Sequence, residues 1–326
     1  MTAPLLLDPS FHARIWGGDQ LTGRFGYTDL PDGPVGECWG ISAHPNGPST
    51  VRNGEHAGQT LQQVWERDPA FFGGPTAGTF PLLAKFLDAG DWLSVQVHPD
   101  DAEALELEGV PRGKTECWYV VAAEPGAELV LGHRAASRAE LGALLDEGRW
   151  DELLLKRPVS AGDFVNVPSG LVHAVGPGLL VYEVQQNCDT TYRVYDFDRR
   201  GADGELRELH LDKARRVLTA PYDPATADTA EPPQEVPGGS RRTLVRGPFF
   251  EVTLHEVRGD GYVVRVPGYE LCTVVEGEGA VSWADEEHPL RAGDHLVLPA
   301  DAGEVRLEGT LTVVSSRPGT ASSARV

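Results

Sequence analysis

Residues 91–98, DWLSVQVH, decide the fold of this chain. Apolar and polar side chains alternate along them, as they do on a β-strand that turns one face toward an apolar core. The polar face carries Ser94, Gln96 and His98. Because side chains two residues apart on a strand project from the same face, Gln96 and His98 can be aimed at one centre.

Two later segments each supply one more side chain that can bind a metal. Residues 114–121, KTECWYVV, predict a second strand, on which Lys114 and Glu116 share a face. Residues 162–173, GDFVNVPSGLVH, predict a third strand closed by a tight turn that carries His173. Either histidine taken alone would more often be an ordinary, partly buried residue, but together with Glu116 they indicate a metal site.

The donor types narrow the choice of metal. Two imidazoles, a carboxylate and an amide oxygen suit Zn²⁺, with a position left for water or substrate, although iron, manganese and cobalt accept the same donors. A structural zinc site built from cysteines is not indicated, since the four cysteines are scattered and form no Cys-x-x-Cys pair. We therefore predict one divalent cation per chain, taken as Zn²⁺, held by Gln96, His98, Glu116 and His173.

Charge and composition exclude several classes of function. The chain has 326 residues and a net charge of −21, so a nucleic-acid binder, which needs a basic surface, is excluded. No apolar run approaches the ~20 residues of a membrane span, and residues 1–9 lack the basic start and apolar core of a signal peptide. Scattered cysteines fit a reducing compartment. We therefore predict a cytoplasmic protein with neither a nucleic-acid nor a membrane partner.

The segment from Gly162 to His173 fits the pattern Gly-x5-Pro-x-Gly-x2-His and resembles the second motif of the cupin family. The first cupin motif normally begins His-x-His, whereas this chain has Gln96-Val97-His98. That departure, with the stretches LSVQVHPDD, GKTECWYV, VPSGLVHAVG and YEVQQNCDTTYRVYDFDR, resembles the type I phosphomannose isomerases of the short bacterial form. RIWGG and GECWGISAHPNGPS near the N-terminus are similar too, so the resemblance covers most of the first 220 residues.

The resemblance implies an activity and a role for each candidate residue. The activity is a metal-dependent aldose–ketose isomerisation that interconverts mannose 6-phosphate and fructose 6-phosphate through an enediol. The family's metal ligands fall on the four donors named above, and its catalytic arginine falls on Arg193. An acidic active-site residue falls on Glu183, and substrate-facing residues fall on Ser94 and Lys114. A further basic residue, expected at the substrate phosphate, falls on Arg199.

The general base and the class of reaction each have alternatives. Either Glu183 or Lys114 can take the proton, the lysine only if burial and the metal depress its pKa. Two histidines and a carboxylate also fit the facial triad of an iron oxygenase, although an oxygenase has less use for cationic residues beside the metal. A non-catalytic sugar-binding cupin is the third alternative.

An internal repeat predicts the domain organisation. Residues 161–168, AGDFVNVP, are echoed by residues 292–299, AGDHLVLP, and residues 116–121 are more loosely echoed by residues 270–275. The fold class is therefore mainly all-β, with two cupin or jelly-roll barrels. In the second copy the residues that follow the turn, Ala302 among them, include no histidine in the place of His173, so that barrel is expected to lack metal ligands.

The predicted boundaries follow from this repeat. Residues 1–220 form the catalytic cupin domain with an N-terminal extension, and residues 240–326 form the second cupin-like domain. Residues 221–239 are rich in proline and predict a linker or surface loop. A helical insertion at about 137–155 begins with the capping-box sequence Ser137 to Glu140. Two other short helices are predicted over residues 102–107 and 61–67.

Overall fold

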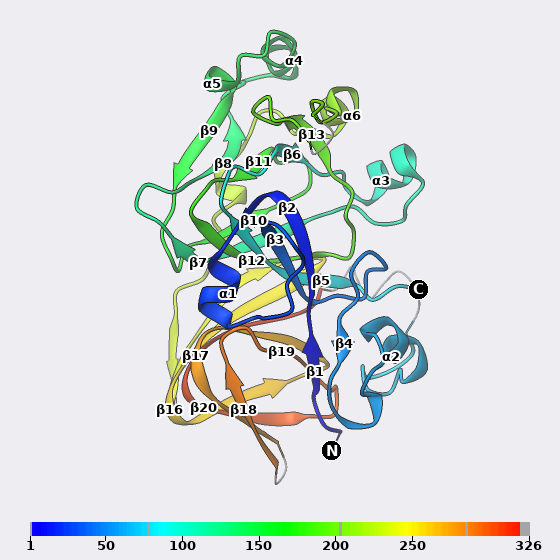
Figure 1. The fold of residues 1–326 in the computed structure, drawn as a ribbon, viewed down its shortest axis with the longest axis vertical. Helices are drawn as coiled ribbons and strands as arrows, with labels where there is room; N and C mark the ends of the chain where they lie inside the picture. The colour runs from blue at the N-terminus through cyan, green and yellow to red at the C-terminus, as the bar shows by residue number, and fades with distance from the viewer. Residues whose placement is uncertain (1, 77, 202–203, 284–285, 320–326) are drawn as a thin grey trace.

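The protein is described by a computed structural model that covers residues 2–76, 78–201, 204–283 and 286–319. It is elongated, with one β-rich assembly above another (Figure 1). The predicted all-β class with a few short helices is confirmed.

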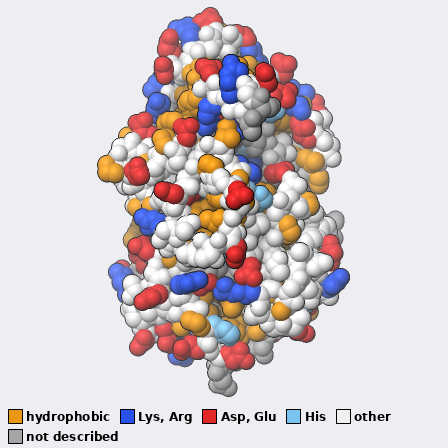
Figure 2. All heavy atoms as spheres, in the orientation of Figure 1, with side chains coloured by type: hydrophobic (Ala, Val, Ile, Leu, Met, Phe, Trp, Pro, Cys, Tyr) orange, Lys and Arg blue, Asp and Glu red, His pale blue; other side chains and the backbone are white. Residues whose placement is uncertain are grey.

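Acidic and basic side chains intermingle on the face shown in Figure 2. None of the helices in the described residues is both long and apolar enough to cross a membrane.

The upper assembly packs a six-stranded sheet against a five-stranded sheet. The six-stranded sheet has the order β10-β7-β12-β5-β2-β3. Its strands are β2 (Ser10–Gly18), β3 (Val35–Ile41), β5 (Leu82–Ala89), β7 (Glu116–Ala123), β10 (Phe164–Val167) and β12 (Leu179–Gln186). The five-stranded sheet has the order β13-β6-β11-β8-β9. Its strands are β6 (Val95–Val97), β8 (Glu128–His133), β9 (Leu154–Pro158), β11 (His173–Val175) and β13 (Tyr192–Tyr195).

The core of this first barrel lies between the two sheets. Val120 and Val181 from the six-stranded sheet belong to one buried cluster with Leu129 and Val175 from the five-stranded sheet. β-Branched and leucine side chains on the inward faces of both sheets exclude water there. The polar donors of β6, β7 and β11 lie at the edge of this hydrophobic core.

The lower assembly is a single nine-stranded sheet curled into a second barrel. Its order is β14-β15-β16-β20-β17-β19-β1-β4, with β18 paired to β17. The strands are β1 (Leu5–Asp8), β4 (Thr50–Val51), β14 (Gln234–Val236), β15 (Gly239–Arg246), β16 (Phe250–Val266), β17 (Glu270–Trp283), β18 (Glu286–Arg291), β19 (His295–Leu298) and β20 (Gly303–Pro318). The N-terminal strand β1 thus pairs with β19, far away in the sequence.

A buried apolar layer joins the two barrels. Phe86 and Tyr182, on the outer face of the six-stranded sheet, belong to one cluster with Leu254 and Val314 of the lower sheet. The Tyr182 hydroxyl donates to Thr273 Oγ1 at 2.8 Å across this layer. Large side chains buried on both sides fix how the barrels sit against each other.

The helices agree with the sequence where it carried capping signals. They are α1 (Gln20–Phe25), α2 (Leu61–Arg67), α3 (Asp101–Glu108), α4 (Arg138–Asp146), α5 (Trp150–Leu153) and α6 (Leu211–Val217), with 3₁₀ turns at Gly54–His56 and Pro224–Thr226. The three predicted helices correspond to α2, α3 and α4, whereas α1 and α6 were not predicted. Ser137 caps α4 by accepting from Glu140 N, but the Glu140 carboxylate accepts from Ala136 N, so the capping box is only half formed.

Residues 221–239 contain short ordered elements. They include one 3₁₀ turn and β14, which pairs with β15. Ala227 is buried in the core of the first barrel, and Thr229 Oγ1 donates to Leu244 O of the second at 2.8 Å. The segment therefore follows the surface from one barrel to the other with contacts to both.

Candidate metal centre and active-site cavity

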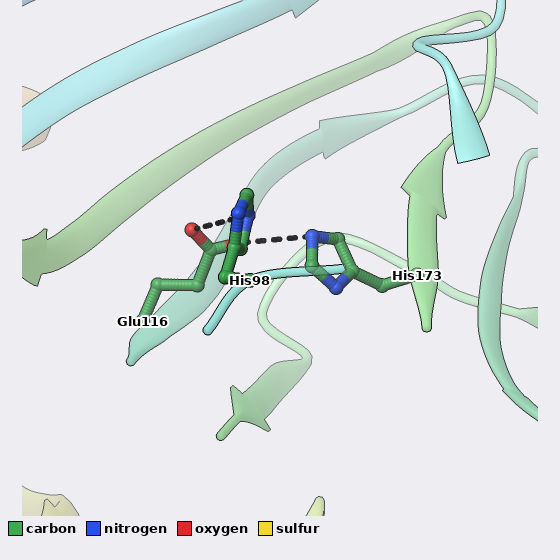
Figure 3. A group of neighbouring side chains, drawn as sticks. All are labelled: His98, Glu116 and His173. Carbon is green, nitrogen blue, oxygen red and sulfur yellow. Dashed lines mark ion pairs between the residues drawn. The ribbon is translucent and has the colours of Figure 1, made fainter. Parts of the chain in front are cut away.

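Three of the four predicted metal donors meet in the first barrel. His98 directly follows β6, Glu116 begins β7 and His173 begins β11. The Nε2 atom of His98 lies 3.5 Å from Glu116 Oε2, and the Nε2 atom of His173 lies 3.3 Å from Glu116 Oε1. One donor atom of each residue lies within 4.8 Å of the other two. Figure 3 shows the two imidazoles facing the carboxylate.

Hydrogen bonds to the backbone orient both imidazoles. His98 Nδ1 bonds to Thr190 O at 2.9 Å, and His173 Nδ1 bonds to Leu171 O at 2.8 Å. A carbonyl can only accept, so each Nδ1 carries the proton and each Nε2 presents a lone pair to the centre. This is the tautomer that a metal requires.

Gln96 lies beside this centre. The register of the five-stranded sheet places it directly opposite His173, and Gln96 Nε2 lies 3.3 Å from His173 Nε2. Since the two ends of a side-chain amide are exchanged by a half-turn, the amide oxygen can take the same position. The four donors from β6, β7 and β11 are therefore neighbours.

The charges at the centre fit a cation. Glu116 is 0 % exposed, and its Oε1 atom accepts no hydrogen bond from any described residue. Burial and the nearby Glu183 raise the pKa of Glu116 to about 7, while burial lowers the pKa of His173 to about 4. Two neutral imidazoles and a carboxylate that face one another with unshared electron pairs are the donor set of a divalent metal.

A cavity of about 270 Å³ opens next to the donors. It brings together four of the predicted substrate and catalytic residues, Ser94, Lys114, Glu183 and Arg193, with the predicted metal ligand Gln96. Lys114 Nζ lies 2.7 Å from Glu116 Oε2. Burial alone would lower the pKa of Lys114, but Glu116 and Glu183 outweigh it and raise that pKa, so the residue is a cation here.

Glu183 is held by groups on three sides. Its Oε2 atom accepts from Trp118 Nε1 at 2.9 Å, and its Oε1 atom lies 3.1 Å from Lys85 Nζ and 3.7 Å from Lys114 Nζ. Burial alone would raise the pKa of Glu183, but the two lysines outweigh it and hold that pKa below its ordinary value. Glu183 is therefore an ionised carboxylate at the cavity wall.

Arg193 has an unused donor. Its Nη1 atom donates to Glu208 O at 2.7 Å, whereas its Nε–H is buried and has no hydrogen-bond partner among the described residues. Burial and the nearby Arg207 lower the pKa of Arg193. Because a guanidinium nevertheless stays charged at neutral pH, Arg193 places a positive charge in the cavity wall.

Arg199 is not among the residues that line the cavity. Its guanidinium contacts Asp196 Oδ1 at 2.6 Å and Asp91 Oδ2 at 3.5 Å, and it donates to Trp92 O. Arg207 lines the cavity and also contacts Asp196, with its Nε donating to Asp196 Oδ2 at 2.6 Å. The phosphate-binding role of Arg199 stays a prediction; of the two arginines that contact Asp196, Arg207 is the one that lines the cavity.

Sequence reasoning missed a group of cavity residues next to Glu183. Lys85 Nζ lies 3.5 Å from Glu37 Oε2, and Glu37 Oε1 accepts from Arg14 Nε at 2.8 Å. Trp39 Nε1 also donates to Glu37, at 2.6 Å. The signal for Lys85 was present, since a charged residue interrupts the apolar run LLAKFLDA of residues 82–89. Arg14 and Glu37 lie in the stretches RIWGG and GECWGISAHPNGPS, which carried the resemblance but gave neither residue a role.

Comparison with known proteins identifies the family. The chain is 46 % identical to a mannose-6-phosphate isomerase from Streptococcus mutans over 97 % of its own length and 98 % of the relative's. The chain belongs to the type I phosphomannose isomerase family. It is also 44 % identical to a mannose-6-phosphate isomerase from Bacillus subtilis, over 94 % of this chain and 96 % of that protein.

Family models and solved structures agree with this assignment. A model described as phosphomannose isomerase type I, catalytic domain, matches residues 5–118, and one described as mannose-6-phosphate isomerase, cupin domain, matches residues 240–318. The crystal structure of a mannose 6-phosphate isomerase from Bacillus subtilis is 42 % identical, with a TM-score of 0.93 over 97 % of this chain and 100 % of that chain. A variant phosphomannose isomerase from Salmonella typhimurium is 16 % identical with a TM-score of 0.79, which bears on the fold alone.

Proposed function

We propose that this protein interconverts mannose 6-phosphate and fructose 6-phosphate in a metal-dependent reaction that passes through an enediol. The observation that carries the proposal is the pair of buried imidazoles whose Nε2 lone pairs face Glu116 beside a cavity with cationic walls. A chain with a net charge of −21 repels anions over most of its surface. A phosphorylated sugar therefore needs such a local group of cations.

For the metal we propose Zn²⁺, one per chain, held by His98, Glu116, His173 and Gln96. The donor set supports this choice, because Zn²⁺ accepts imidazole, carboxylate and amide-oxygen donors and can add water or a substrate oxygen as a fifth ligand. Bound there, the cation would polarise substrate oxygens and stabilise negative charge. This would lower the activation barrier by several kcal/mol.

For the sugar phosphate we propose contacts from both ends of the cavity. Arg193 offers its free Nε–H and a fixed positive charge close to where the enediol forms. Ser94 offers a hydroxyl for a sugar oxygen. Arg207, oriented by Asp196, is placed to meet the phosphate, with Arg199 on the other side of the same carboxylate.

For proton transfer we propose Glu183 as the general base. In the forward direction it takes the proton from C2 of the aldose and returns it to C1, while the proton on O2 moves to O1. Its position in the wall, with Lys85 and Lys114 on one oxygen and Trp118 on the other, supports this role. Lys114 is the alternative base. With Glu116 and Glu183 beside it, its charged form is favoured, which suits it better to bind a substrate oxygen.

The predicted division of the chain and its location remain part of the proposal. We take residues 1–220 as the catalytic part, 221–239 as the connection and 240–326 as a second domain without metal ligands. Four buried free cysteines support a reducing, cytoplasmic compartment.

A coupled assay tests the activity. We expect turnover of mannose 6-phosphate that exhaustive chelation abolishes and added Zn²⁺ restores. An iron oxygenase would instead consume oxygen and prefer iron, and a sugar-binding cupin would bind without turnover. Full activity of a chain shown by elemental analysis to be metal-free would refute the metal assignment.

A further inference from the structure

The second barrel repeats the strand pairing of the first. In the first barrel Lys85 lies opposite Glu183 across β5 and β12. In the second barrel Thr253 lies opposite Ser315 across β16 and β20. The strands β3, β5, β12, β7 and β10 thus correspond in order to β15, β16, β20, β17 and β19.

A second cavity, of about 530 Å³, lies where this correspondence puts the active-site cavity. Equivalent positions line both. Glu37, Lys85, Leu87 and Gln185 in the first barrel correspond to Arg241, Thr253, His255 and Arg317 in the second. The second barrel has therefore kept the pocket and changed its chemistry.

Three buried polar side chains, His255, Tyr262 and Glu270, line part of the second cavity and are joined by hydrogen bonds behind it. The Ser315 hydroxyl lies between Glu270 Oε1, at 2.7 Å, and His255 Nε2, at 2.8 Å. His255 Nδ1 bonds to the Tyr262 hydroxyl at 2.9 Å, and that hydroxyl donates to Ser240 O at 3.1 Å. These side chains, all less than 10 % exposed, form an ordered polar surface in a barrel interior that is otherwise apolar.

The arginines that line the second cavity differ in whether a carboxylate pairs with them. Arg317, Arg246 and Arg265 each face a carboxylate within the cavity lining, namely Glu251, Glu231 and Glu304 respectively. Arg241 has no ion-pair partner among the described residues, and its closest contact of this kind is the Gln234 amide at 3.4 Å. It stands beside His255. Burial of that imidazole, together with the charge of Arg241, lowers the pKa of His255 to about 4.

These features select a ligand with one anionic group and a neutral hydroxylated body. Four arginines and four glutamates line the cavity, so a second anionic group on the ligand would meet a carboxylate. The paired arginines and glutamates, with the Thr243 and Thr253 hydroxyls, offer alternating donors and acceptors for sugar hydroxyls. A volume of about 530 Å³ falls within the range for small-molecule sites.

We propose that the second barrel binds a sugar monophosphate in this cavity, without metal, with Arg241 at the phosphate and the threonine hydroxyls at the sugar. The site is separate from the metal centre and takes no part in turnover. It requires only that the second cavity is open to a ligand, so it does not depend on the isomerase activity.

Calorimetric titration of the metal-loaded full chain with fructose 6-phosphate tests the site. We expect two binding sites per chain in the wild type, and at least a tenfold weakening of one of them in Arg241→Ala with turnover unchanged. The control is Arg258→Ala, an exposed arginine of β16 that pairs with Glu235 outside the cavity lining; it should keep both sites. Unphosphorylated fructose should bind the second site at least tenfold more weakly than its phosphate.

The two proposals fail separately. In His98→Ala we expect turnover to be lost while the Arg241-dependent site remains. A single site per chain in the wild type that Arg241→Ala leaves intact would overturn the second cavity as a ligand site. So would two sites that Arg241→Ala leaves equally tight, and so would equal affinity for fructose and its phosphate. The active-site assignment would be untouched by any of these results.

Discussion

The two barrels contain the same turn, at residues 160–163 and 291–294, with the same hydrogen bond in each, but among the described residues only the first barrel has a candidate metal centre beyond it. In the first barrel Asp163 Oδ2 accepts from Ser160 N at 2.8 Å, and in the second Asp294 Oδ2 accepts from Arg291 N at 2.9 Å. Each turn leads into a short strand. In the first barrel this is β10, which pairs with β7, and in the second it is β19, which pairs with β17. The repeated motif AGD thus belongs to the architecture and carries no ligand itself.

The difference lies in the turn at the end of each of these short strands. In the first barrel Gly170 has φ +83°, and its N–H donates to His98 O at 2.9 Å, which joins the His173 turn to the other histidine. A Cβ at Gly170 would come within 2.5 Å of Thr219 Oγ1, so the close approach requires glycine. The second barrel has Asp301 in the corresponding turn. A cupin barrel therefore folds without its metal donors, and metal chemistry depends on a few residues beyond the shared strands.

The largest effect is expected from His98→Ala. It removes a metal ligand, so bound metal should fall to background and kcat by roughly a thousandfold or more. Elemental analysis and the coupled assay measure both. Arg193→Ala should lose most turnover but keep its metal. A buried histidine of the second barrel offers the matched control: His255→Ala should keep both. Loss of metal in His255→Ala would break the separation of the two barrels.

Lys85→Met tests the wall that sequence reasoning missed. It removes the cation between Glu37 and Glu183, and we expect kcat to fall about a hundredfold, within the range of general acid–base effects. Loss of a positive charge raises the pKa of Glu183, so the acidic limb of the kcat/KM profile should move to higher pH. Thr253→Val, at the equivalent position in the second barrel, should leave the profile unchanged. An unshifted limb in Lys85→Met would argue against Glu183 as the base.

His255 should make the second barrel sensitive to acid. Its pKa is about 4 in the folded chain and ~6.5 in an unfolded one. The unfolded state therefore takes up the proton first, and the stability present above pH 6.5 is lost as pH falls toward 4. Between pH 7 and pH 4.5 the wild type should lose about 2 kcal/mol more unfolding free energy than His255→Gln. Urea titrations at both pH values measure this difference; parallel losses in the two proteins would refute it.

The smallest effect is expected from the two equivalent turns. Asp163→Ala removes one hydrogen bond to a backbone N–H and should lower the unfolding free energy by about 1 kcal/mol. Asp294→Ala should lose a few tenths of a kcal/mol more, because Arg52 Nη2 also bonds to Asp294 Oδ1, at 2.9 Å. Denaturant unfolding measures both. A loss several times larger in one barrel would show that the turns are not equivalent.

Local patterns in the sequence were enough to predict the metal donors and the short helices. Alternation along residues 91–98 placed Gln96 and His98 on one strand face, and the capping signal at Ser137 stands directly before α4. Such signals act within a few residues, so the sequence alone can reveal them.

Pairings between distant strands were decided only in the folded chain. Glu37 and Lys85 meet because β3 pairs with β5, and β1 joins the second barrel by pairing with β19. The same holds for Arg207, which reaches the cavity, and for Arg241, which faces the second one. Side-chain alternation says which face of a strand is polar, but which strand lies beside it depends on how the whole core packs, and that information is spread over the entire chain.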